Sequence, residues 1–246
     1  MRYFIQIAYN GKDFHGWQVQ PNANTVQAEM NKALTTYFNQ GKIHCVGCGR
    51  TDTGVHATDF FLHFDIEQPI NEKESAYRLN RILPFTIAVK KIIKVSDTAH
   101  SRFDALSRTY EYHLHTSKNP FLLDGSLFYP YPLDLDKMNR ACQILFKHSD
   151  FTSFSKVHSD AKTNICTIMA AHWKQKDDKI IFTIQADRFL RNMVRAIVGT
   201  MLKIGQGKIS IEDFEQIILQ KDRGKAGKSV DGKALYLTKV EYPAKQ

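Results

Sequence analysis

Gly49-Arg50-Thr51-Asp52-Thr53-Gly54-Val55-His56-Ala57 places one carboxylate between two glycines and beside an arginine, immediately before the alternating run from Thr58 to Ile66. The backbone can turn freely at the two glycines, so Asp52 is expected at the wall of a cleft, where a regular strand would not put it. Residues 43–48 predict a short strand before this stretch. Asp52 is therefore expected on the connection between two strands.

Three interpretations of this stretch compete. In the first, it is a tight turn in which Asp52 and Thr53 bond their own backbone groups. In the second, Asp-Thr-Gly belongs to an aspartic protease, which would need a symmetric dimer because the chain has no second Asp-Thr-Gly or Asp-Ser-Gly. In the third, it is a catalytic loop of another kind, which only the rest of the chain can identify.

The elements around this stretch predict an α+β unit. Arg2 to Tyr9 and Thr86 to Val95 alternate like strands, and 71–83 looks like a helix that Pro84 stops. Asn24 or Thr25 should cap a further helix. An aromatic loop at residues 14–18 either lines the core or contacts a base. Four strands and two helices make up a ferredoxin-like or RNA-recognition-like half.

A similar order of elements recurs in the second half. Strands are expected at 108–115, 163–174, 179–186 and 234–242, and helices at 134–145, at 189–204 and after Ser210, which with Asp213 predicts a capping box. We expect residues 221–233 to form a mobile basic loop. With no obvious linker, the two halves, 1–105 and 106–246, are predicted to share one sheet and act as one catalytic unit.

The composition predicts a folded protein with a polyanionic partner. A chain of 246 residues with 43% hydrophobic content can bury a substantial core, and a net charge of +9 favours nucleic acid as the partner. The amino terminus lacks the apolar core of a signal peptide, and no stretch approaches the ~20 apolar residues of a membrane span. We expect a cytoplasmic protein with reduced thiols.

Metal binding is a weaker interpretation of the cysteines. Cys45 and Cys48 form a C-x-x-C pair, but Cys142 and Cys166 lie far from them and from each other. A structural zinc site usually shows a second close pair of ligands. Buried thiols are the expected state, and no metal site is predicted.

Three arginines accompany the helix predicted at 189–204. Arg188, Arg191 and Arg195 fall three and four positions apart, which would align them on one side near the helix start. Such residues often form only a solvated flank. Arg195, however, lies within an apolar run, where a buried cation needs a carboxylate partner, and Asp52 is the candidate.

The nonapeptide resembles the catalytic motif of the tRNA pseudouridine synthase A family. The resemblance extends in order along nearly the whole chain, through Phe14-His15-Gly16-Trp17-Gln18, Ser107-Arg108-Thr109-Tyr110-Glu111-Tyr112, Asp150-Phe151-Thr152-Ser153-Phe154, the Arg195 helix and Leu235-Tyr236-Leu237 with Val240 and Tyr242.

The resemblance implies a pseudouridine synthase fold, in which two α+β halves are joined through a central antiparallel sheet flanked by helices. It also implies an isomerase, usually a homodimer, that converts uridine to pseudouridine at positions 38, 39 and 40 in the anticodon stem-loop of tRNA, with no metal or other cofactor. Asp52 would be the catalytic aspartate, Tyr110 the tyrosine that stacks on the target base, and Arg195 the partner of Asp52. Arg50 would help to hold the flipped nucleotide.

The chemistry suits these residue types. The reaction breaks the bond from C1′ to N1 and joins C1′ to C5, so an ionised carboxylate at Asp52 can act as a nucleophile or stabilise a sugar cation. A base that leaves its stack calls for an aromatic platform such as Tyr110, whose hydroxyl could also take part in removing the C5 proton. Basic residues, Arg188 and Arg191 among them, would hold phosphates.

Two positions depart from the family pattern. Cys166 stands where many members have an arginine, which puts in doubt any contact that the arginine would make. Thr53 stands where alanine is common. The rival prediction from another class is a non-catalytic RNA-binding or RNA-chaperone protein on the same scaffold, which would have no use for the carboxylate of Asp52.

Overall fold

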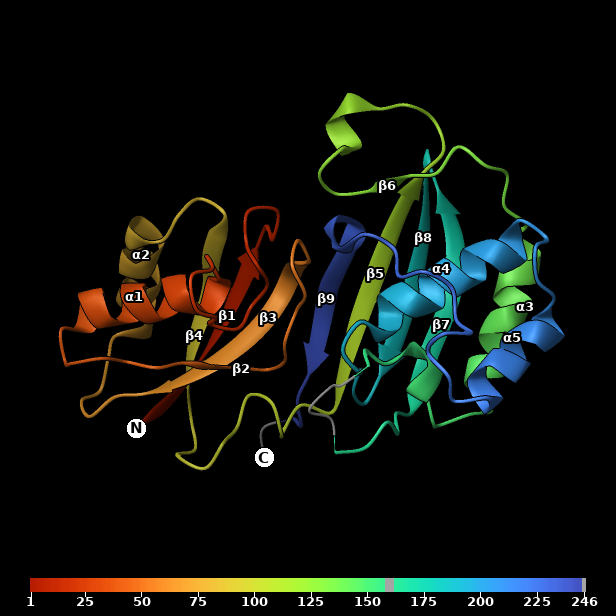
Figure 1. The fold of residues 1–246 in the computed structure, drawn as a ribbon. Coiled ribbons are helices and arrows are strands. Elements are labelled where there is room, and N and C mark those ends of the chain that lie inside the picture. The colour runs from red at the N-terminus through yellow and green to blue at the C-terminus, as the bar shows by residue number, and fades with distance from the viewer. Residues whose placement is uncertain (158–161, 245–246) are drawn as a thin grey trace. The chain divides into compact units, whose positions relative to one another are not determined.

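The computed structural model describes residues 1–157 and 162–244 and divides the chain into two compact units. The first unit comprises Met1–Leu106 together with the segment that begins at Tyr236, and the second comprises Ser107–Leu235. Each unit combines a sheet with α-helices (Figure 1), so the predicted α+β class is confirmed.

Three long strands form the sheet of the first unit: β1 (Arg2–Tyr9), β3 (His56–Asp65) and β4 (Ile87–Val95). β1 lies between β4 and β3 and pairs antiparallel with both. The short β2 (Val46–Gly47) pairs antiparallel with β3. On the side of β3 away from β1, β9 (Leu235–Glu241) is a parallel neighbour, so the sheet is mixed rather than purely antiparallel.

The parallel pairing of β9 corrects the predicted division of the chain. The sequence placed everything from residue 106 to 246 in the second half, but Tyr236 and Leu237 pair with His56 and Ala57 of β3. The backbone N–H of Val240 also donates to Asp59 Oδ2 at 3.1 Å. The last strand therefore completes the first unit.

Two helices cover the sheet of the first unit, and Figure 1 shows them beside each other. In α1 (Val26–Phe38) the buried side chains recur at helical spacing, and Thr25 Oγ1 caps the first turn by accepting from the N–H of Ala28. In α2 (Glu72–Ile82), Asn71 Oδ1 accepts from the N–H of Glu74 in the same way. Thr25 is one of the two caps that the sequence offered for α1, and α2 lies within the helix predicted at 71–83.

The second unit is built on β5 (Ser107–His115), β8 (Lys179–Ala186) and β7 (Ile168–Lys176), an antiparallel sheet in that order. The short β6 (Leu127–Phe128) pairs parallel with β5. Three helices complete this unit (Figure 1): α3 (Leu135–Leu145) packs against β7, and α4 (Met193–Gly205) and α5 (Ile211–Leu219) pack against α3 and against each other. Short 3-10 helices occur at Pro120–Leu122, Thr152–Phe154 and Gly232–Ala234.

Helix α4 is largely buried in the second unit. Ten of its thirteen residues are buried, and the indole N–H of Trp173 on β7 contacts Met201 Sδ at 3.3 Å. The capping box predicted at Ser210 and Asp213 is present at the start of α5. It stabilises the helix that packs against the end of α4.

Some predicted boundaries are wrong. The helix expected from residue 189 begins at Met193, because Asn192 adopts a left-handed conformation with φ at +70° that a helix cannot continue. The strand expected from residue 163 begins at Ile168, and the one expected at 43–48 is only β2. Conversely, β3 begins at His56, inside the nonapeptide.

No helix among the described residues is long and apolar enough to cross a membrane. The four cysteines are buried and carry free thiols. Burial raises the pKa of Cys45, Cys142 and Cys166 to about 12, which keeps these thiols protonated.

Candidate active site

The nonapeptide connects β2 to β3 as a compact loop. Its backbone closes where the N–H of Val55 donates to the carbonyl of Asp52 at 3.2 Å, and Gly54 turns the chain with φ at +76°. Thr51 is buried and Asp52 is half-buried. Asp52 thus lies on a hydrogen-bonded turn just before the start of β3.

The aromatic loop at residues 14–18 is hydrogen-bonded to this turn. The N–H of Trp17 donates to the carbonyl of Thr51, and the N–H of Gly54 donates to the carbonyl of Phe14, each at 3.2 Å. Phe14 and Trp17 are only 3% and 2% exposed. Of the two roles that the sequence left open, the structure favours core lining.

Two glycines of the preceding segment allow the loops to come this close. A Cβ at Gly11 would lie 1.9 Å from the carbonyl oxygen of Val55, and one at Gly16 would lie 2.3 Å from that of Thr51. Gly16 also has φ at +90°, which side chains rarely tolerate. Any larger residue at either position would displace the turn that carries Asp52.

Buried polar contacts fix the two ends of the turn. The Tyr9 hydroxyl lies 2.8 Å from Thr51 Oγ1, and His56 Nδ1 accepts from the N–H of Gly11 at 3.0 Å. The His56 ring stacks on Tyr236 of β9, with centroids 4.6 Å apart. The returning C-terminal strand therefore helps to hold the start of β3.

Tyr110 lies in the middle of β5, half-buried and opposite Ile184 of β8. Its ring meets the edge of Phe189, with centroids 5.1 Å apart. Tyr112, two residues along, shares the same face of the strand and donates its hydroxyl to the carbonyl of Asp231 at 2.9 Å.

Arg195 is half-buried in the first turn of α4 and is oriented by the loop that precedes β9. Its Nε donates to the carbonyl of Val230 at 2.7 Å, while the N–H of Val230 donates to the carbonyl of Arg195 at 3.2 Å. This reciprocal pair sets the direction of the guanidinium group.

Hydrogen bonds tie the loop at 221–233, which the sequence predicted to be mobile, to itself and to α4. Arg223 donates to the carbonyl of Gly227 and to Ser229 Oγ, and the Ser229 hydroxyl also accepts from Asn192 Nδ2 at 2.5 Å. The N–H of Gly227 donates to Thr200 Oγ1 on α4 at 2.8 Å. We call residues 223–231 the clamp loop.

The other predicted arginines lie outside helices. Arg188 and Arg191 precede α4, so the predicted alignment of three arginines along one helix face is wrong. Arg188 is half-buried, with its N–H bonded to Asp187 Oδ1, and Arg191 is exposed. Arg50 is exposed beside Asp52 in the first unit.

The candidate residues therefore come from both units: Asp52 and Arg50 from the first, and Tyr110, Arg188, Arg191 and Arg195 from the second. Their convergence on one substrate stays a prediction. In the second unit, the clamp loop contacts both Arg195 and Tyr112, which stands beside Tyr110 on β5.

No group of three or more His, Cys, Asp or Glu side chains that could hold a metal ion occurs among residues 1–157 and 162–244. The two departures from the family pattern do not disturb the turn at Asp52. Cys166 is fully buried, its N–H bonded to the carbonyl of Ser149, and Thr53 is exposed.

Comparison with known proteins decides the family. A family model described as tRNA pseudouridine synthase matches residues 141–243. A protein of Bacteroides fragilis named tRNA pseudouridine synthase A is 53% identical over 98% of this chain and 96% of its own length. The chain belongs to the tRNA pseudouridine synthase A family. A Parabacteroides distasonis member is 54% identical over the same shares, and a Listeria monocytogenes member is 38% identical over 98% of this chain and 99% of its own.

The sequence alone did not identify the residues that support the candidate site. Tyr9, Gly11 and His56 hold the Asp52 turn, and the clamp loop holds Arg195. Gly11 and Gly16 were a usable signal, since glycine marks close backbone approach. His56 gave none, because a lone histidine in a motif does not reveal its partner.

Proposed function

We propose that this protein isomerises uridine to pseudouridine in tRNA, at positions 38, 39 and 40 of the anticodon stem-loop. The observation that carries the proposal is identity of about half the residues, over nearly the full chain, with proteins named tRNA pseudouridine synthase A. The net charge of +9 supports a polyanionic substrate.

Asp52 is the proposed nucleophile. Its carboxylate attacks the target nucleotide, either at C1′ of the ribose or at C6 of the uracil, while the bond from C1′ to N1 breaks and the uracil turns. C1′ then joins C5, and the bond between Asp52 and the attacked carbon breaks, which releases the carboxylate. The C5 proton leaves and N1 gains a proton, so the formula of the nucleotide is unchanged. Support comes from the fixed turn, which holds Asp52 half-buried at the end of β3.

The remaining roles belong to residues that bind and orient. Tyr110 stacks on the displaced base, Arg195 pairs with Asp52 and favours its ionised form, and Arg50 holds the flipped nucleotide. Arg188 and Arg191 contact phosphates, which positions the tRNA without reading its sequence. An isomerisation needs no electron donor or acceptor, and we propose that it proceeds without a cofactor.

The protein is further proposed to act as a homodimer in the cytoplasm. The compartment is supported by the four free thiols, since a reducing environment keeps cysteines unpaired. The dimer rests on the family resemblance, and sedimentation of the purified protein would test it.

The direct test is to incubate the purified protein with an unmodified tRNA transcript and map pseudouridine along it. We expect pseudouridine at positions 38, 39 or 40, wherever the transcript carries uridine there. A protein that binds the transcript and forms none would be the non-catalytic RNA binder, and the enzyme assignment would fail. Pseudouridine at other positions alone would overturn the proposed target sites.

A further inference from the structure

An exposed aromatic side chain stands beside an arginine in the segment that follows β4. Phe103 is 74% exposed, and the guanidinium carbon of Arg102 lies 5.7 Å from the centroid of its ring. The His100 ring lies 4.2 Å from the same ring, tilted by 31°. We call Arg102 and Phe103 the platform.

The turn that carries the platform is closed on itself. The N–H of His100 donates to Asp104 Oδ2 at 2.7 Å, and the N–H of Asp104 donates back to the carbonyl of His100 at 3.0 Å. His100 Nδ1 accepts from the backbone N–H groups of both platform residues, at 3.1 and 3.3 Å. The backbone beneath the platform is thus fixed on its outer side.

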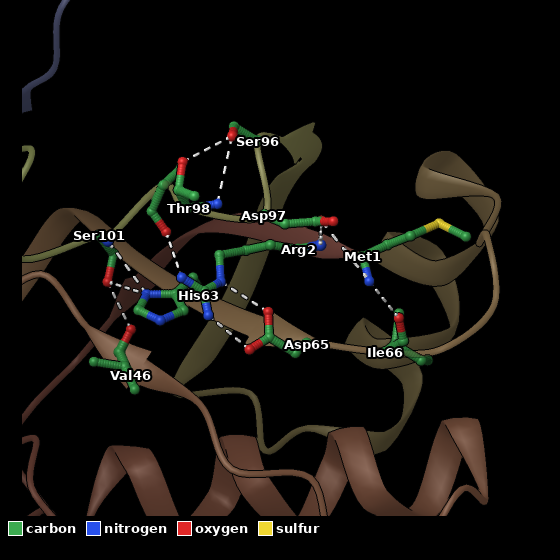
Figure 2. A network of polar contacts seen from close by, with 11 residues as sticks. Met1, Arg2, Val46, His63, Asp65, Ile66, Ser96, Asp97, Thr98 and Ser101 are labelled. Carbon is green, nitrogen blue, oxygen red and sulfur yellow. Dashed lines mark hydrogen bonds and ion pairs between the residues drawn. The ribbon is translucent and has the colours of Figure 1, made fainter.

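A polar network anchors the inner side of this turn to the sheet, as Figure 2 shows. The Arg2 guanidinium bonds both carboxylate oxygens of Asp65 at 2.7 Å and donates to the carbonyl of Ala99 at 2.8 Å. Ser101 donates its N–H to His63 Nδ1 and its hydroxyl to the carbonyl of Val46.

A series of neighbouring aromatic and imidazole rings also extends from the core to the platform. Phe4 and His63 are buried, His100 is half-buried with its ring 4.7 Å from that of His63, and Phe103 is mostly exposed. An exposed phenylalanine on a flexible loop would need no such support. Here several buried or half-buried groups fix the position of the platform and leave the Phe103 ring exposed.

We propose that Arg102 and Phe103 bind an unpaired base of the tRNA, which stacks on the exposed phenyl ring. Proteins recognise unstacked bases with aromatic rings and arginine planes, and a fixed platform loses little entropy on binding. The positive charge of Arg102 and of the whole chain favours a nucleic acid over an uncharged apolar partner. The inference rests on the proposed action on tRNA but not on which residue reacts.

The experiment measures the affinity of an unmodified tRNA transcript for the wild type and for Phe103→Ala, Phe103→Leu and Phe103→Trp. Phe103→Ala and Phe103→Leu remove the stacking surface and should weaken binding by about tenfold. Phe103→Trp should retain wild-type affinity, because it keeps an aromatic face. Phe85→Ala is the matched control, since Phe85 is a fully exposed phenylalanine of the same unit. The affinity of this variant for tRNA should equal that of the wild type.

Salt dependence separates the two platform residues. Phe103→Ala should leave the slope of log affinity against log salt unchanged, whereas Arg102→Ala should reduce it by about one if the guanidinium also neutralises a phosphate. Wild-type affinity in both Phe103→Ala and Phe103→Leu would overturn the proposal. So would a change of oligomeric state in either variant without tRNA, because the platform would then be an interface between copies of the chain.

Pseudouridine formation by the wild type, measured on the same transcript, keeps the two proposals apart. If the wild type turns over and the Phe103 variants bind normally, only the platform fails. If the wild type does not bind tRNA, the proposed function is wrong, and the platform proposal, which rests on it, is wrong as well.

Discussion

Asp52 is held in place by the backbones of neighbouring residues rather than by a helix or strand of its own. The carbonyls of Thr51 and Val55 lie so close to Gly16 and Gly11 that no side chain fits between them. Tyr9 and His56 satisfy the buried polar groups at either end. A nucleophile on such a turn is positioned before substrate arrives, which lowers the cost of reaching the reactive geometry.

A second buried histidine of the first unit should give the protein a measurable response to acid. His63 is 4% exposed, and burial, together with the charges of Arg2 and His100, lowers its pKa to about 4, against the smaller opposing effects of Asp65 and Asp104. Protonation of Nδ1 would also oppose the N–H that Ser101 donates to it.

We therefore predict that the free energy of unfolding falls as pH is lowered from about 6.5 to about 4. In that interval the unfolded chain binds a proton at residue 63 and the folded chain does not, so acid favours unfolding. Urea denaturation of the wild type and His63→Asn measures the effect. The difference between the two proteins isolates His63 from His115, whose pKa burial also lowers. An equal loss of stability in both proteins would contradict the prediction.

At the scale of elements, the start of α4 and the clamp loop together orient the side chain of Arg195. Asn192 ends the preceding segment in a left-handed conformation and bonds Ser229, and one turn later Arg195 exchanges backbone and side-chain bonds with Val230. The close approach of loop and helix occurs at Gly199, where a Cβ would lie 1.9 Å from the carbonyl oxygen of Lys228.

Gly199→Ala should destabilise the protein, although alanine is the better helix former by about 1 kcal/mol. The added methyl group must push the clamp loop away from α4, at a cost of about 1–3 kcal/mol, and the bond from Arg195 Nε to Val230 weakens with it. Urea denaturation and single-turnover pseudouridine formation measure the two effects. Lys203→Ala, at an exposed position of the same helix, is the control and should change neither. Increased stability in Gly199→Ala would contradict this account.

The sequence predicted regular elements well where local signals are strong. Thr25, Asn71 and the capping box at Ser210 mark their helices correctly, because side-chain caps act within one turn. It failed at Asn192, which is left-handed and whose side chain bonds Ser229, 37 residues away. The site followed the same rule: the motif residues were identifiable, whereas their support by Gly11, His56 and the clamp loop depends on contacts distant in sequence.

At the scale of the whole molecule, the proposed chemistry draws on both units. Asp52 and Arg50 come from the first, and Tyr110 and Arg195 from the second, while the C-terminal strand returns to pair with β3 at the end of the Asp52 turn. The central claim is that these residues serve one step on one bound tRNA. Residues that act as a unit should each be needed for turnover, and Asp52, as an anion, should contribute little to tRNA binding.

The most direct test is single-turnover pseudouridine formation on an unmodified tRNA transcript by the wild type, Asp52→Ala and Arg195→Ala, with tRNA affinity measured on the same proteins. We predict no detectable turnover for Asp52→Ala with affinity largely intact, because removing an anion does not weaken phosphate binding. Arg195→Ala should lose about 100-fold or more in rate, with a much smaller change in affinity. Substantial turnover by Asp52→Ala, or a wild-type rate for Arg195→Ala, would contradict a shared active site.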